Sequence, residues 1–188
     1  MYKMEKKQDT IRIPPNRLDE DIEEVTKNIA REELEGIIDN SSKLIILATN
    51  IERMGDGKVV HGDGGIYQDV KYDALLFELI EQELILGYLC EVLKFGAFVR
   101  FGPLDGLLHI SQIMNDKVEV NQGNQRLVGK EQNKSLAIDE EIRARIVTVS
   151  INERSPRESK IGLTMRQNGL GKIEWIEEEL EEEEEEAS

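Results

Sequence analysis

The sequence predicts two domains, an α+β domain of a helix on a small antiparallel sheet followed by an all-β barrel of five short strands. Three observations lead to this expectation. Residues 18–37 carry apolar residues at helical spacing. The segments 43–51 and 66–79, which follow the helix, have the composition or the alternation of strands. From residue 83 onward, five short strand-like segments are separated by turns, with a long polar insertion after the third.

The first domain, residues 1–80, begins with a short strand at residues 10–15, TIRIPP. Two prolines stop this strand, because proline has no amide hydrogen to donate to a sheet. Asn16 can cap the helix that follows, and Gly36 marks its end. The apolar positions of that helix are Leu18, Ile22, Val25, Ile29 and Leu34. Such an amphipathic helix needs a sheet on which to bury its apolar face.

The segment between the two later strands of this domain is rich in glycine. MGDGKVVHGDGG, residues 54–65, holds five glycines and two Gly-Asp-Gly triplets. The first triplet predicts a tight turn, with residues 58–61 as a short returning strand.

The second domain, residues 81–176, has the strand pattern of an OB-fold barrel. The expected strands are residues 83–95, 96–102, 104–110, 142–151 and 160–166. Residues 111–114 fit a single helical turn, and the insertion 115–141 is polar and loop-like, with one strand near Leu127 and Val128. Five short strands with a long insertion after the third describe a small closed barrel.

Charge and composition restrict the function classes. The net charge of −15 falls to −6 when the nine glutamates of residues 177–188 are set aside. This acidic tail should be disordered by self-repulsion, either as a solubilising tail or as a brush that repels nucleic acid or contacts a basic partner. The lone Cys90, the absence of a signal sequence and the absence of a membrane-spanning apolar run favour a cytoplasmic or nucleoid location.

The hairpin around residues 94–111, KFGAFVRFGPLDGLLHIS, carries the candidate binding residues. In an extended strand Phe98 and Arg100 share one face, Phe95 sits at the bend, and His109 lies on a neighbouring strand. A ring beside a cation suits a nucleobase and a phosphate. The alternative is that both rings are corner and core residues of the barrel. Further positive charge comes from Lys94, Arg143, Arg145, Lys160 and Arg166.

Other chemistry finds little support in the sequence. The segment 62–65, Gly-Asp-Gly-Gly, lacks the Lys-Ser/Thr ending of a phosphate loop. His61 and Asp63 are too few for a metal site, and His109 lies in the other domain. We therefore expect no metal, no cofactor and no catalytic residue in this chain.

The segment FGAFVRFGPLDGLLHISQI, residues 95–113, resembles the OB-fold RNA-binding domain repeated in the ribosomal protein S-one. This resemblance implies that Phe95, Phe98 and His109 are stacking residues and that Lys160 is a basic contact. The family's frequent Asp at the end of the fourth strand is replaced by Ser150. With the nearby cations, the expected RNA-binding set is Phe95, Phe98, Arg100, His109, Lys160 and Arg166.

The order of the domains extends the resemblance. IRIPPNRL (11–18), MGDGKVVHGDGG (54–65), VKYDALLF (70–77) and LTMRQNGLGKIEWI (163–176) are similar to the E (E prime) stalk subunit of archaeal RNA polymerase. That family is the counterpart of the seventh subunit of eukaryotic RNA polymerase II. The resemblance implies a non-catalytic subunit of DNA-directed RNA polymerase. It would form a stalk with the small helical F subunit, dock near the clamp and bind nascent single-stranded RNA to support transcription.

The resemblance also implies contact residues for the partner proteins. The glycine-rich segment becomes a loop at the tip of the first domain that enters the polymerase core. The expected docking residues are Gly55, Asp56, Gly57, Gly62 and Gly64. The F subunit is expected to pack against Leu84, Ile85 and Leu86. Two alternatives stay open: a translation-associated or ribosome-associated RNA-binding protein with the same barrel, and an enzyme such as a nuclease that uses the barrel as an accessory domain.

Overall fold

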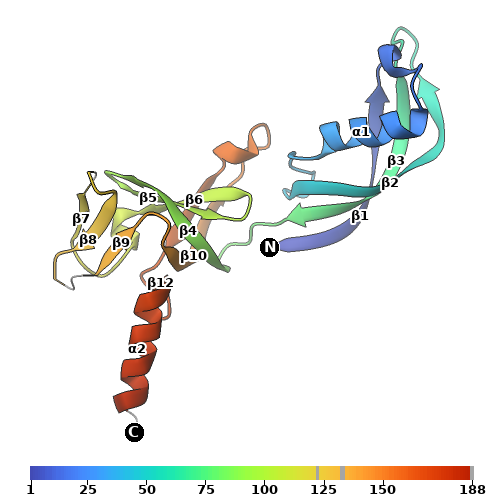
Figure 1. The fold of residues 1–188 in the computed structure, drawn as a ribbon. Coiled ribbons are helices and arrows are strands. Elements are labelled where there is room, and N and C mark those ends of the chain that lie inside the picture. The colour runs from blue at the N-terminus through green and yellow to red at the C-terminus, as the bar shows by residue number, and fades with distance from the viewer. Residues whose placement is uncertain (122, 132–133, 187–188) are drawn as a thin grey trace. The chain divides into compact units, whose positions relative to one another are not determined.

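The computed structural model describes residues 1–121, 123–131 and 134–186 of the chain (Figure 1). It divides into two compact units. The first comprises Met1–Leu79 together with Glu153–Pro156, and the second comprises Ile80–Asn152 with Arg157–Ser188. Each unit has its own sheet and its own core.

The first unit is a three-stranded antiparallel sheet with one helix on it, which confirms the predicted α+β architecture (Figure 1). Its strands are β1 (Tyr2–Ile13), β2 (Leu44–Val59) and β3 (Ile66–Phe77), and β3 lies in the centre. A 3₁₀ turn, η1 (Pro15–Arg17), leads from β1 toward helix α1 (Ile22–Leu34).

Helix α1 begins later than its apolar pattern suggested, because Asp21 and not Asn16 caps it. The Asp21 carboxylate accepts a hydrogen bond of 2.9 Å from the Glu23 amide, which satisfies one of the free donors of the first turn. The pattern itself continues into the preceding turn, where Leu18 packs partly buried against the same core as Ile22.

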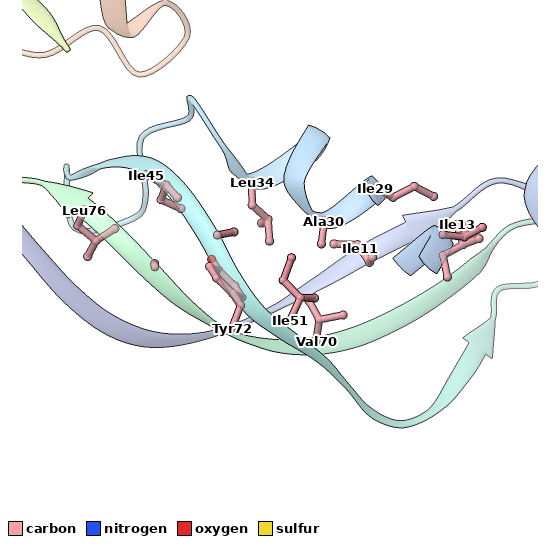
Figure 2. Close-up of a cluster of buried hydrophobic side chains, with 13 residues drawn as sticks. Ile11, Ile13, Ile29, Ala30, Leu34, Ile45, Ile51, Val70, Tyr72 and Leu76 are labelled. Carbon is pink, nitrogen blue, oxygen red and sulfur yellow. The ribbon is translucent and has the colours of Figure 1, made fainter. Parts of the chain in front are cut away.

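The core of this unit lies between α1 and the facing side of the sheet. Figure 2 shows Ile29, Ala30 and Leu34 pointing from the helix toward the strands. The strands contribute the buried residues Ile11, Ile13, Ile45, Ile51, Val70, Tyr72 and Leu76. The apolar residues at helical spacing in α1 and those at alternate positions of the strands therefore pack together in one layer.

Strand β1 is much longer than the predicted segment 10–15, since it begins at Tyr2. Residues 2–9 carry mostly charged and polar residues instead of apolar ones, which hides their strand character from a hydrophobic pattern. The charges find partners across the unit: Lys7 pairs with Asp39, and Lys43 Nζ lies 2.8 Å from Glu5 Oε1. Pairing with the central strand β3 along its whole length keeps this segment extended.

The first Gly-Asp-Gly triplet does not form the predicted turn. It is a bulge inside the continuous strand β2, since Met54 pairs with Asp69 and Lys58 pairs with Tyr67. A Cβ at Gly57 would overlap with the Ile66 side chain, and Gly55 adopts a φ of +64°. The turn lies further on, at residues 60–65. Glycine was thus needed for a bulge and not for chain reversal.

The second unit is a closed barrel of five strands, as predicted. The barrel strands are β4 (Leu84–Leu93), β5 (Gly96–Phe101), β6 (Leu104–His109), β10 (Glu141–Ser150) and β11 (Lys160–Thr164). Neighbours pair in the order β11-β6-β5-β4-β10, and an additional β10–β11 pairing closes the ring. Only the β11–β6 contact within this ring is parallel. A 3₁₀ turn, η3 (Pro156–Glu158), connects β10 to β11.

The insertion after β6 is more regular than predicted. A 3₁₀ turn, η2 (Ile110–Gln112), agrees with the expected single turn. Three short strands then form a separate antiparallel sheet: β7 (Val118–Asn121), β8 (Arg126–Gly129) and β9 (Ser135–Ala137). Each of the latter two strands buries a single leucine, Leu127 and Leu136. Strand β8 confirms the strand expected near Leu127 and Val128. The single buried leucine of the three-residue strand β9 is too weak a periodic signal to identify it from sequence.

The acidic C-terminal segment differs from its predicted disorder. After the two-residue strand β12 (Gly171–Lys172), helix α2 spans Ile173–Glu186; residues 187 and 188 lie outside the described part. In the first turn of α2, the side chains of Trp175 and Ile176 are buried. Further along the helix, Glu179 Oε1 lies 2.8 Å from Lys134 Nζ. Glutamate also has a good intrinsic helix propensity. Formation of the first turn is the costly step of helix formation. Because burial holds this first turn in place, the helix can continue into the glutamate run.

Candidate nucleic-acid interface

The pairing of β5 with β6 places the candidate residues on one outward face of the barrel. Phe98 lies opposite Leu107, Arg100 opposite Asp105, and Gly96 opposite His109. The intervening residues Ala97, Val99 and Phe101 are buried in the core. The strict alternation of the strand therefore separates a packing face from an outward face that carries Phe98, Arg100 and His109.

Phe95 escapes this alternation because it lies in the turn between β4 and β5. Its side chain is 48% exposed. Gly96, which follows, adopts a φ of +155°, and a Cβ there would overlap with the Leu108 carbonyl oxygen. This close approach of two backbones requires glycine. The Phe-Gly-x-Phe sequence thus turns the chain sharply enough for both rings to reach the outward side.

A groove of about 670 Å³ lies between this hairpin and strands β10 and β11. Phe95 and Phe98 line one side of it, and Lys160 and Arg157 belong to the other. Gly162 lines the groove with its backbone alone. A side chain does not fit at this position, because a Cβ would overlap with the Thr148 hydroxyl. The groove is within the size range of small-molecule sites and presents two aromatic rings. It can accept a planar heterocycle by stacking.

The charges around the groove are partly neutralised. The Arg100 guanidinium donates to both carboxylate oxygens of Asp105, at 3.0 and 3.3 Å, and this carboxylate raises the pKa of Arg100. Arg100 is therefore a paired cation. Within the part of the chain that the structure describes, Arg157 and Lys160 form no ion pair. They are the groove's available cations, while Glu158 adds a second carboxylate.

His109 and Arg166 lie at a neighbouring position, around Ser111, and do not line the groove. The His109 Nδ1 accepts a hydrogen bond of 3.2 Å from the Ser111 amide, so a neutral ring carries its proton on Nε2. Arg166 donates to the Ser111 carbonyl oxygen at 3.2 Å and to Asn115 Oδ1 at 2.7 Å. These bonds hold both side chains near the end of β6.

Three residues of the expected RNA-binding set, Phe95, Phe98 and Lys160, share one groove, and their binding role stays a prediction. Several other lining residues were not in that set. Asp105, Leu107 and Arg157 also belong to the groove. Strand alternation counted backward from His109 would have placed Asp105 and Leu107 on the same face. No pattern in the sequence could have placed Arg157, because it comes from the loop between β10 and β11.

The expected docking residues of the first unit fall into two separate features. Gly55, Asp56 and Gly57 form the bulge of β2, whereas Gly62 and Gly64 lie in the β2–β3 turn. The buried Gln68 side chain holds the bulge by donating to the carbonyl oxygens of Met54 and Gly55, at 3.2 and 3.3 Å.

A carboxylate holds the turn between β2 and β3. Asp63 accepts hydrogen bonds from Arg12 Nε at 2.8 Å, from the Tyr67 hydroxyl at 2.8 Å and from the Gly65 amide at 3.0 Å. The Arg12 guanidinium, with help from the other two donors, holds the pKa of Asp63 well below its usual range. The turn is thereby fixed to β1 and β3, and its exposed apex includes His61 and Gly62.

The residues expected to contact the F subunit differ in their accessibility. Ile85 is only 2% exposed and belongs to the barrel core, so it is not available to a partner. Leu84 and Leu86 point outward from β4, and so does Tyr88, which was not among the expected contacts. The three exposed residues follow the two-residue period of the strand. Burial contradicts the expectation for Ile85, whereas contact of Leu84 and Leu86 with the F subunit stays a prediction.

The described residues contain no group of three or more His, Cys, Asp or Glu side chains that could hold a metal ion. No described helix is long and apolar enough to cross a membrane.

Comparisons with known proteins match both halves of the chain. Residues 8–64 match the model of the SHS2 domain found in the N terminus of Rpb7p, Rpc25p and MJ0397. Residues 78–160 match the model of the S1 RNA binding domain, which contains the groove-lining hairpin.

Whole-chain relatives are also found. The DNA-directed RNA polymerase subunit Rpo7 of Saccharolobus shibatae is 35% identical over 178 residues, which covers 94% of this chain and 97% of the relative. The subunit of the same name from Sulfolobus acidocaldarius is 33% identical over 180 residues, with 96% and 97% coverage. The DNA-directed RNA polymerase II subunit rpb7 of Dictyostelium discoideum is 25% identical over 115 residues, covering 61% of this chain and 67% of the relative.

Proposed function

The chain belongs to the family of the DNA-directed RNA polymerase subunit Rpo7, and we propose that it forms a stalk on the polymerase that binds nascent single-stranded RNA and supports transcription. It is a non-catalytic subunit of the polymerase complex. Family membership, over nearly the whole length of chain and relatives, favours this function over that of a translation-associated RNA-binding protein or a nuclease.

One observation supports RNA binding in particular: the groove that Phe95 and Phe98 line on the outward face of the barrel. Single strands expose base faces for stacking, whereas a duplex does not. Lys160 and Arg157, which also line the groove, would contact the sugar-phosphate backbone. With an overall charge of −15, the protein attracts phosphate only through such a local patch.

The proposed partners are the F subunit and the polymerase core near its clamp. For the F subunit, support comes from Leu84, Leu86 and Tyr88, whose side chains are 49%, 54% and 53% exposed on one face of β4. When a partner covers an apolar row of this kind, the apolar surface leaves water, which stabilises the complex. With these partners the protein would work in the cytoplasm, at the nucleoid.

We assign residues 1–80 to polymerase docking and residues 81–176 to RNA binding. In the first domain the β2 bulge and the β2–β3 turn are the proposed docking features. Their support is local order: Gln68 fixes one and Asp63 fixes the other by hydrogen bonds. A pre-ordered loop loses less conformational entropy when it docks than a flexible one does.

Copurification with polymerase tests this assignment. Asp56 is exposed in the bulge, and the replacement Asp56→Lys reverses its charge without demanding a new backbone conformation. We expect tagged Asp56→Lys protein to recover polymerase core subunits at least about tenfold less efficiently than the parent, because a longer side chain of opposite charge would disrupt a fitted interface. Glu33→Lys, an exposed charge reversal on α1, is the matched control and should recover them normally.

The experiment has two adverse outcomes. Normal recovery with Asp56→Lys would contradict the docking role of the bulge. Failure of the parent chain itself to recover polymerase subunits would contradict the proposed function as a whole. Thermal melting of both variants verifies that each is folded.

A further inference from the structure

The groove contains a carboxylate next to the stacking ring. Asp105 lines the groove together with Phe95 and Phe98. In the register of β5 and β6, Asp105 faces Arg100, two residues along from the Phe98–Leu107 pair on the same face. Successive same-face rows of a sheet lie roughly 6.6 Å apart, at about 3.3 Å per residue. A base stacked on Phe98 therefore presents an edge toward the row that contains Asp105.

Arg100 fixes the orientation of this carboxylate. Its Nε and Nη2 atoms donate to the two oxygens of Asp105, in the fork geometry that guanidinium groups form with carboxylates. An ionised carboxylate offers about four acceptor positions, and the fork uses one on each oxygen. The Asp105 side chain is 41% exposed, so a ligand can reach the remaining acceptor positions.

The chemistry of Asp105 selects among base edges. An ionised carboxylate only accepts hydrogen bonds. Cytosine, adenine and guanine each carry an exocyclic amino group that can donate to it, and a carboxylate pairs with the cytosine amino group in known recognition patterns. Uracil has carbonyl oxygens on both sides of its single ring N–H, and these oxygens repel a carboxylate. Phosphate is repelled as well, which favours the opposite side of the groove, with Lys160, for the backbone.

We propose that Asp105 is a specificity-determining residue: it accepts a hydrogen bond from the exocyclic amino group of a base stacked on Phe98, so the groove prefers amino-bearing bases to uracil. This inference rests on the proposed RNA-binding function. Arg100 acts here as a positioning residue: it pairs with Asp105 and does not bind a phosphate group of the RNA.

Cytosine and uracil form the sharpest pair of probes, because both are pyrimidines and differ little in stacking area. We expect the parent protein to bind a labelled C₆ oligoribonucleotide about three- to tenfold more tightly than U₆, the effect of one partly exposed hydrogen bond to a charged group. In Asp105→Asn the ratio should fall to within about twofold, because an amide both donates and accepts. Asp105→Ser, which removes the carboxylate without adding an amide, should lose the preference too.

The ratio of the two affinities is the measured quantity, because removal of any carboxylate strengthens the binding of every RNA. Glu91→Gln is the matched control: Glu91 lies opposite Phe98 on β4 but does not line the groove. This variant should keep the preference for C₆.

Three results would overturn the inference. They are equal binding of C₆ and U₆ by the parent, an unchanged affinity ratio in both Asp105 variants, or a loss of the C₆ preference in Glu91→Gln as large as that in the Asp105 variants. If the parent binds neither oligonucleotide, the proposed RNA-binding function itself fails, and this outcome is distinct from the other three.

Discussion

Replacement of Phe98 by alanine separates a binding ring from a packing ring. Stacking of one base on an aromatic side chain contributes about 1–3 kcal/mol, which corresponds to roughly five- to 150-fold in affinity. Phe98 is half-buried on the outward face, so its removal forfeits only part of the 3–5 kcal/mol that a fully buried Phe→Ala costs, roughly half. We therefore expect a large loss of RNA binding with a moderate loss of stability.

Phe101 provides the matched control on the same strand. Its side chain is 2% exposed and points into the barrel, so Phe101→Ala should cost the full ~3–5 kcal/mol. Fluorescence anisotropy with a labelled single-stranded RNA measures binding, and chemical denaturation measures stability. An RNA duplex, whose base faces are covered, should bind the parent more weakly than the single strand does.

Either of two results would contradict a stacking role for Phe98. If Phe98→Ala binds single-stranded RNA as the parent does, the ring is not a stacking platform. If Phe98→Ala loses as much stability as Phe101→Ala, the outward hairpin is a packing element of the barrel, and the alternative interpretation of this segment is correct.

Three other predictions concern charges. Asp63→Asn should lower the melting temperature at pH 7, because the folded-state pKa of Asp63 is depressed by Arg12. The stabilisation is present above the unfolded-state pKa of about 3.9 and is lost as the pH falls toward the lower folded-state value, so the difference from the parent should shrink in acid; a difference that is constant from pH 7 to pH 2 would contradict this. Lys160→Ala should reduce the salt slope of RNA binding by up to about 0.7, the value for one phosphate contact with a single strand. Arg100→Ala should change that slope less, because Asp105 already pairs with Arg100, and a larger change in Arg100→Ala would contradict the ion-pair argument.

Patterns of local periodicity predicted most of the elements. The apolar spacing of α1 and the strands of the barrel are visible in the sequence, because each of these elements buries one face in a core. Strand β1 was predicted only in part, because charged residues occupy the inward positions of its first half. In the small sheet only β8 was predicted, because β7 half-buries two valines and β9 buries a single leucine. The acidic helix was missed because composition alone predicts repulsion, whereas the anchor is the buried Trp175 at its start.

For the candidate site, the sequence by itself determined which residue types were present: two aromatic rings, a glycine between them, and nearby cations. Strand alternation was enough to separate Phe98 and Arg100 from the core-facing residues of the same strand. Only the tertiary structure decided how these groups combine. Cross-strand register brought Asp105 to Arg100, and a loop from a distant part of the chain brought Arg157 to the groove. Pairing between strands and closure of a barrel depend on contacts far apart in sequence, which no local pattern contains.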